Sequence, residues 1–107
     1  MSLENTKLSE YNVELLLDAI STNRSIKHLN LANNSLGEIS GIAIGEMLIY
    51  NNTMESLDVS WNRMYTDDCI DIWDGLAENM TLKELDIAYN SLGRNPEIVS
   101  GISTTLA

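Results

Sequence analysis

The chain has 107 residues, 44% of them hydrophobic and 21% charged, which suits a single globular domain over its whole length. Six Lys and Arg against 16 Asp and Glu give a net charge of −10, which would repel nucleic acid and anionic membranes over most of the surface. We therefore expect neither as a partner, and no apolar run reaches the roughly 18 residues of a membrane-spanning helix.

The first predicted helix has an apolar face with the i, i+3, i+4, i+7 spacing, formed by Val13, Leu16, Leu17 and Ile20. Ahead of it, Leu3 and Leu8 precede Leu31 and Leu36 by 28 residues, a distance that recurs along the chain. Residues 1–25 are therefore interpreted as a degenerate N-terminal cap followed by a helix.

Residues 26–53 open with the motif Ile26-x-x-Leu29-x-Leu31-x-x-Asn34-x-Leu36. Its alternating leucines predict a short strand with one buried face. The asparagine that follows can bond backbone groups of its own coil and the next one through its amide, so it marks a turn. A second helix is predicted after the turn, with a buried face formed by Gly41, Ile44, Gly45 and Leu48.

The motif returns twice, each time after 28 residues, in segments 54–81 and 82–107. The copies are Met54-x-x-Leu57-x-Val59-x-x-Asn62-x-Met64 and Leu82-x-x-Leu85-x-Ile87-x-x-Asn90-x-Leu92. A fixed period of this length indicates strand-turn-helix units that stack and share one core. We therefore expect three parallel strands, centred on Leu29–Leu31, Leu57–Val59 and Leu85–Ile87.

The third helix is predicted to bury Cys69, Ile72, Trp73 and Leu76, with the indole of Trp73 packed against the Gly45 position of the preceding helix. Three Asn-x-Ser/Thr sites begin at Asn23, Asn51 and Asn79. They have the same period, so they are interpreted as a repeated turn from helix into strand rather than as glycosylation sites.

The last repeat departs from the pattern after Asn95-Pro96, which resembles a helix cap followed by a proline in the first turn. If the 28-residue period is kept, the buried face of this last helix is formed by Glu97, Ser100, Gly101 and Thr104. A shift by one residue instead turns Ile98 and Ile102 inward. Either register leaves a weakly apolar helix and an uncovered last strand. We therefore expect residues 94–107 to fray, or the chain to self-associate there.

These motifs resemble leucine-rich repeat proteins of the ribonuclease-inhibitor type, over residues 9–107. The phrases Leu29-Asn30-Leu31-Ala32-Asn33-Asn34-Ser35-Leu36-Gly37 and Leu85-Asp86-Ile87-Ala88-Tyr89-Asn90-Ser91-Leu92-Gly93 carry the resemblance. It implies an α/β solenoid, a short right-handed arc with a parallel sheet on its concave face and helices on its convex face. The resemblance does not choose a function, because such folds serve as inhibitors, sensors, GTPase-activating proteins and scaffolds.

No catalytic, cofactor or metal site is expected. His28 is the only histidine, and no glycine-rich phosphate loop is present. Asp67, Asp71 and Asp74 could share a helix face, but acidic residues in a first turn ordinarily oppose the helix dipole. Cys69 is the only cysteine, which favours an intracellular, cytoplasmic protein with a buried and inert thiol.

Function is expected on the concave face, where the residues alternating with the buried leucines point outward. The candidate partner-binding residues are His28, Asn30, Asn33, Asp58, Trp61, Glu84, Asp86 and Tyr89. Aromatic residues beside carboxylates suit binding of a basic protein or peptide. The alternative for Trp61 and Tyr89 is that they only cover the asparagine turns.

The sequence therefore predicts a non-catalytic protein-binding module. Two alternatives stay open: a regulator of a small GTPase, like the GTPase-activating members of the family, and a fragment that continues a longer scaffold or sensor.

Overall fold

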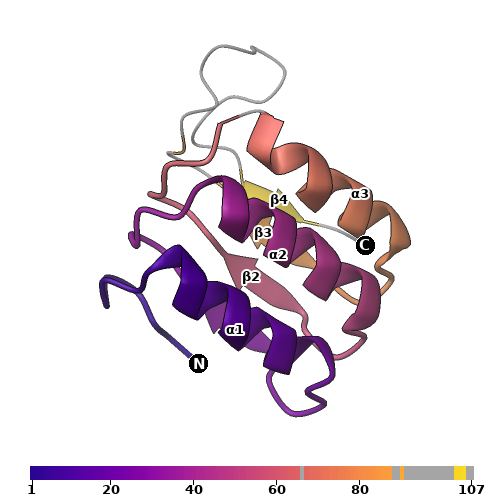
Figure 1. Ribbon diagram of the computed structural model, residues 1–107. Coiled ribbons are helices and arrows are strands. Elements are labelled where there is room, and N and C mark those ends of the chain that lie inside the picture. The colour runs from indigo at the N-terminus through magenta and orange to yellow at the C-terminus, as the bar shows by residue number, and fades with distance from the viewer. Residues whose placement is uncertain (66, 88–89, 91–102, 106–107) are drawn as a thin grey trace.

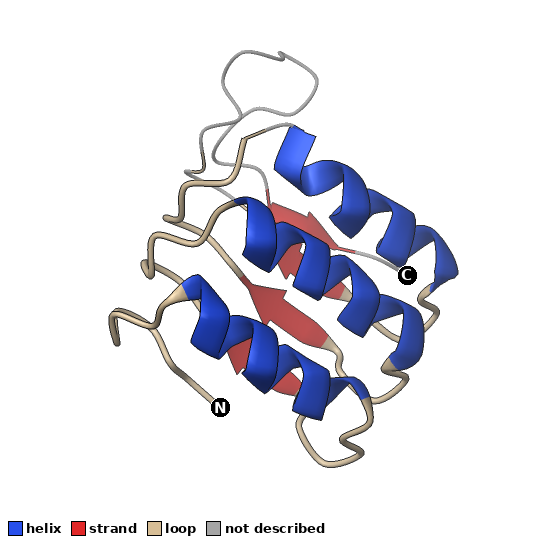
Figure 2. Cartoon of the chain, in the orientation of Figure 1, coloured by secondary structure: helices blue, strands red, loops and turns tan. Residues whose placement is uncertain are grey.

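The computed structural model describes residues 1–65, 67–87, 90 and 103–105. Three helices pack side by side over one face of a four-stranded sheet, so the fold has two layers (Figures 1 and 2). The helices are α1 (Glu10–Ser21), α2 (Glu38–Tyr50) and α3 (Ile70–Glu78), the last preceded by the 3-10 turn η1 (Asp67–Cys69). The strands are β1 (His28–Asn30), β2 (Ser56–Asp58), β3 (Glu84–Asp86) and β4 (Ser103–Thr105).

The first three strands are parallel and lie in chain order, as the sequence predicts. Leu29 is paired with Leu57, and Leu57 with Leu85, so equivalent residues of successive motifs are neighbours across the sheet. Each parallel pair is joined through a helix, which is the connection that parallel strands require. The expected strand-turn-helix order is confirmed for the described residues.

β4 corrects the expectation for the end of the chain. Thr104 was expected on the buried face of a last helix, but it lies in a strand and pairs with Leu85 in an antiparallel ladder. The edge of β3 is therefore paired and not uncovered, because backbone groups along that edge need hydrogen-bond partners. The expected cap at Asn95-Pro96 and the helix positions from Glu97 to Ile102 lie outside the described residues. Self-association stays a prediction, without the uncovered edge that supported it.

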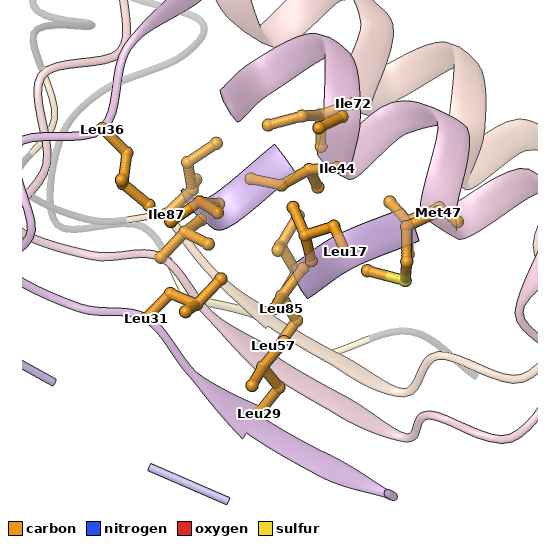
Figure 3. Close-up of a cluster of buried hydrophobic side chains, with 14 of the residues drawn as sticks. Leu17, Leu29, Leu31, Leu36, Ile44, Met47, Leu57, Ile72, Leu85 and Ile87 are labelled. Atoms are coloured by element: carbon orange, nitrogen blue, oxygen red, sulfur yellow. The ribbon is translucent and has the colours of Figure 1, made fainter. Parts of the chain in front are cut away.

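The core lies between the sheet and the helices. Figure 3 shows Leu29, Leu57 and Leu85 in a column, with Leu17, Ile44 and Ile72 of the three helices above them. All six side chains are almost completely buried. Burying a leucine or isoleucine contributes roughly 1.5 to 3 kcal/mol, so the stacked motifs are the main source of stability.

The asparagine of each motif forms a ladder that ties neighbouring repeats together. The Oδ1 atom of Asn62 accepts from the N–H groups of Asn34 at 2.8 Å and Leu36 at 3.0 Å, both in the preceding repeat. Its Nδ2 group donates to the carbonyls of Leu31, Val59 and Ser60. Asn34, Asn62 and Asn90 are all buried, and the predicted structural ladder is confirmed.

The N-terminal residues continue this ladder by one step. Ser2 forms a parallel bridge with Asn30, and Asn34 Oδ1 accepts from the N–H groups of Thr6 and Leu8. These contacts have the same spacing as those that Asn62 makes with the repeat before it. Residues 1–8 therefore occupy the place of a partial repeat beside β1.

A second asparagine ladder lies where each helix leads into the next strand. Asn51 Nδ2 donates to the Ile20 carbonyl at 2.7 Å, and its Oδ1 accepts from Thr53 and Met54. Asn79 makes the equivalent bonds one repeat later, with the Leu48 carbonyl at 2.9 Å. The interpretation of these sites as a repeated turn is confirmed.

The close packing of α2 and α3 depends on glycines, but not in the expected way. The atoms nearest to the place of a Gly45 Cβ belong to Asp71 and not to Trp73. A Cβ on Gly75 would lie 2.5 Å from the Gly45 carbonyl oxygen. The two helices therefore meet backbone to backbone, while Trp73 packs half-buried against the core.

Candidate functional site

The face of the sheet opposite the helices carries a short array of polar side chains. Because Leu29, Leu57 and Leu85 point toward the helices, the residues on either side of each point the opposite way. We call this surface the open face and define it by His28, Asn30, Ser56, Asp58, Glu84 and Asp86. All six are exposed or half-exposed, and the predicted site residues among them lie together.

Several open-face side chains form hydrogen bonds with one another or with the turn that follows their strand. His28 Nδ1 and Ser56 Oγ are 2.8 Å apart. Asn30 Oδ1 accepts from the Ala32 N–H, and Asp58 Oδ1 accepts from the N–H and hydroxyl of Ser60. Sequence reasoning missed this local role, although Asn and Asp commonly bond a backbone group two residues on. These side chains are therefore fixed in place before any partner arrives.

The charges along the start of the strands alternate in sign. Lys27 and Lys83 each lie 3.9 Å from a carboxylate oxygen of Glu55, between them. The side chains of both lysines are mostly exposed, so each ion pair contributes well under about 1 kcal/mol. The carboxylates of Asp58, Glu84 and Asp86 lie on the open face beside this balanced row.

Trp61 and Asn33 lie just beyond the strands and share an unusual backbone conformation. Their φ angles are 55° and 58°, in the left-handed region that Asn tolerates and that a bulky side chain seldom adopts. Holding Trp there costs on the order of 1 to 3 kcal/mol. The Trp61 side chain is nevertheless 58% exposed. Tyr89, the third predicted position of this column, lies outside the described residues.

Residues 1–65, 67–87, 90 and 103–105 contain neither a candidate metal centre nor a candidate membrane-spanning helix. No group of three or more His, Cys, Asp or Glu that could hold a metal ion is found among them. None of the helices in this part of the chain is long and apolar enough to cross a membrane.

Cys69 is the only cysteine and lies fully buried at the start of α3. Burial, and to a smaller extent the nearby Asp68 carboxylate, raises the pKa of its thiol to about 12. Thiol chemistry proceeds through the thiolate, so the folded chain presents almost none of the reactive form near neutral pH. The predicted burial of the thiol is confirmed.

The raised pKa predicts slow modification of Cys69. At about pH 8 the folded chain should react with a thiol reagent about a thousand times more slowly than the urea-unfolded chain, because its thiolate fraction is lower by that factor. The release of a coloured thiolate from an aromatic disulfide reagent measures both rates. Equal rates in the two states would contradict a buried thiol.

Comparison with known proteins agrees with this architecture. The family model described as Leucine Rich repeat matches residues 22–45, 50–68 and 78–94. Among solved structures, leiomodin-1 actin-binding site 2 is similar, with a TM-score of 0.79 and 23% identity. The match covers 95% of this chain and 56% of that chain, so this chain spans little more than half of that structure. At this identity the similarity shows a shared fold.

A comparison with curated proteins found no match. The family model, however, matches more than half of the residues, over the segments that carry the strands and asparagine turns. The chain therefore belongs to the leucine-rich repeat family.

Proposed function

We propose that this chain is a non-catalytic protein-binding module that uses its open face to bind a basic protein or peptide. In this proposal the chain is an intracellular solenoid of the ribonuclease-inhibitor type with 28-residue repeats, and the open face is its concave side. The contact residues are His28, Asn30, Asn33, Asp58, Trp61, Glu84, Asp86 and Tyr89. The fold that this chain shares with the structure of an actin-binding site supports a protein partner.

The observation that carries the proposal is the conformation of Trp61. The equivalent position one repeat earlier is Asn33, which suits the left-handed backbone. Trp61 takes that conformation at a cost, and more than half of its side chain stays in solvent. A strained and exposed tryptophan in the turn after β2 is better explained by contact with a partner than by folding, since Trp dominates binding hot spots.

The test is affinity capture from cell extract with matched variants. Asp58→Asn, Glu84→Gln and Asp86→Asn together remove the open-face charges, and the amide oxygen introduced at position 58 can still accept the Ser60 hydrogen bonds. Glu38→Gln, Asp74→Asn and Glu78→Gln remove the same number of charges from exposed positions of the helices. A partner kept by the helix variant and lost by the open-face variant and by Trp61→Ala supports the proposal; the reverse pattern contradicts it.

Two specific partners can be tested with purified chain. Actin is one, because the similar structure is that of an actin-binding site. Co-sedimentation with filamentous actin, reduced by Trp61→Ala, would identify it. The alternative of a GTPase regulator predicts instead faster GTP hydrolysis by a small GTPase when the chain is added.

Trp61→Asn separates binding from folding. Asparagine tolerates the left-handed backbone, so the variant should unfold at the same urea concentration as the parent or a higher one, with relief of up to about 1 to 3 kcal/mol of strain. The same variant should lose the captured partner. A marked loss of stability would instead support the alternative that Trp61 covers the asparagine turn.

A further inference from the structure

The outer surface of the helices has a charge distribution that the sheet lacks. α1, α2 and α3 carry Glu10, Glu14, Asp18, Glu38, Glu46, Asp71, Asp74 and Glu78. None of the six lysines and arginines of the chain, nor its histidine, lies in these three helices. The helical layer therefore presents one sign of charge, whereas lysines and glutamates alternate along the strand starts.

α2 is apolar on its outer side as well as on its buried side. Ile44 and Leu48 face the core, but Ile39, Ile42 and Ile49 are each more than two-fifths exposed. The three isoleucines recur at positions i, i+3 and i+10 and so lie on one stripe of the helix. A helix that is apolar around its circumference is normally covered on both sides. In this chain the sheet covers only one of them (Figure 2).

A groove of about 320 Å³ runs between α1 and α2 on this outer side. Its apolar lining includes Leu15 of α1 together with Ile42 and Tyr50 of α2, all of them exposed. Its lining also includes the carboxylates of Glu14, Asp18 and Glu46. The groove therefore combines apolar side chains with carboxylates of a single sign.

We propose that this α1–α2 groove binds a basic amphipathic helix of a partner protein. Large apolar side chains of the partner would lie on Leu15, Ile42 and Tyr50, and its flanking lysines or arginines would approach Glu14, Asp18 and Glu46. α2 is 13 residues long, about 20 Å, which is enough for three turns of a docked helix. This is the helix-in-groove mode of recognition, on the side of the molecule opposite the open face.

The charge of the groove favours a basic helix over a second copy of the chain or an anionic lipid surface. A second copy of the chain docked by the same surface would bring Glu14, Asp18 and Glu46 against identical carboxylates. An anionic lipid surface would meet the same repulsion. A basic helix is attracted by these groups and covers the apolar residues between them.

The experiment measures binding of a synthetic peptide to the full chain. The probe is a helical peptide about as long as α2, with leucine along one face and lysine on the rest. A scrambled peptide of identical composition, which has no apolar face, is the control for charge alone. Fluorescence anisotropy of the labelled peptide gives the two affinities, and the helical peptide should bind about ten times more tightly or better.

Matched variants locate the contact. Ile42→Lys places a charge in the groove, whereas Ile70→Lys makes the same change on α3, at an exposed isoleucine outside it. Ile42→Lys should weaken binding of the helical peptide by about ten-fold or more, while Ile70→Lys leaves it unchanged. Equal melting temperatures of the two lysine variants show that both fold.

Four results would overturn the proposal. They are equal binding of the scrambled peptide, equal loss in the two lysine variants, chain dimerisation that Ile42→Lys abolishes, and adsorption to phosphatidylcholine vesicles in place of peptide binding. The third would assign the groove to a second copy, and the fourth to lipid.

Discussion

Replacing Asn62 by leucine should destabilise the fold by about 2 to 6 kcal/mol, because two buried N–H groups lose their acceptor at about 1 to 3 kcal/mol each. Those groups belong to Asn34 and Leu36, in the repeat before Asn62. The carbonyls of Leu31 and Val59 lose a donor as well. Since domains of this size are stable by only about 5 to 15 kcal/mol, the variant should be close to unfolding at room temperature.

Urea unfolding followed by circular dichroism measures the effect. Asn52→Leu is the matched control, because Asn52 follows the ladder residue Asn51 but is exposed. The control should stay within about 0.5 kcal/mol of the parent. If Asn62→Leu unfolded at the same urea concentration as Asn52→Leu, the turn ladder would contribute nothing to stability.

The repeated part of the fold could be predicted because equivalent residues of each motif make equivalent contacts. Leucines at alternate positions define the buried side of a strand, and Asn34, Asn62 and Asn90 recur where the chain leaves the strands. A contact in one repeat therefore predicts the equivalent contact in the next. The bond from Thr6 to Asn34 shows that this reasoning extends to the start of the chain, where only two leucines of the motif are present.

The end of the chain could not be predicted from the period, because β4 does not follow it. Residues 103–105 pair with β3 in the opposite direction from every other strand. What determines that pairing is the row of backbone N–H and C=O groups along β3, which any extended segment can satisfy. The two threonines in Ser103-Thr104-Thr105 favour a strand, and this was the available local signal.

For the open face, alternation along the strands was sufficient to bring His28, Asp58 and Glu84 to one side. The backbone of Trp61 was not predictable, because the motif gives a residue type and not a φ angle. The α1–α2 groove was also missed. Its signal was the apolar outer side of α2, but the groove depends on the distance between two helices, which sequence spacing does not give.

The separation of α2 and α3 is set by the glycines between them. Replacing Gly45 by alanine should therefore destabilise the chain, which is the reverse of the usual effect of Gly→Ala in a helix. Gly→Ala in a helix ordinarily stabilises by about 0.5 to 1 kcal/mol. Here the new Cβ would overlap the carbonyl of Asp71, which is backbone and cannot move alone. α3 must shift away from α2, so Gly45→Ala should destabilise the chain by about 1 to 3 kcal/mol.

Gly75→Ala provides an independent measurement of the same contact from the other helix, since its Cβ would lie 2.5 Å from the Gly45 carbonyl oxygen. Both single variants should unfold at lower urea concentration than the parent. The double variant should lose less than the sum of the two, because the helices need to separate only once and residues in contact are not additive. Additive losses would mean that each methyl group is accommodated by its own surroundings. A stabilised Gly45→Ala variant would show that the helices are not held at this separation.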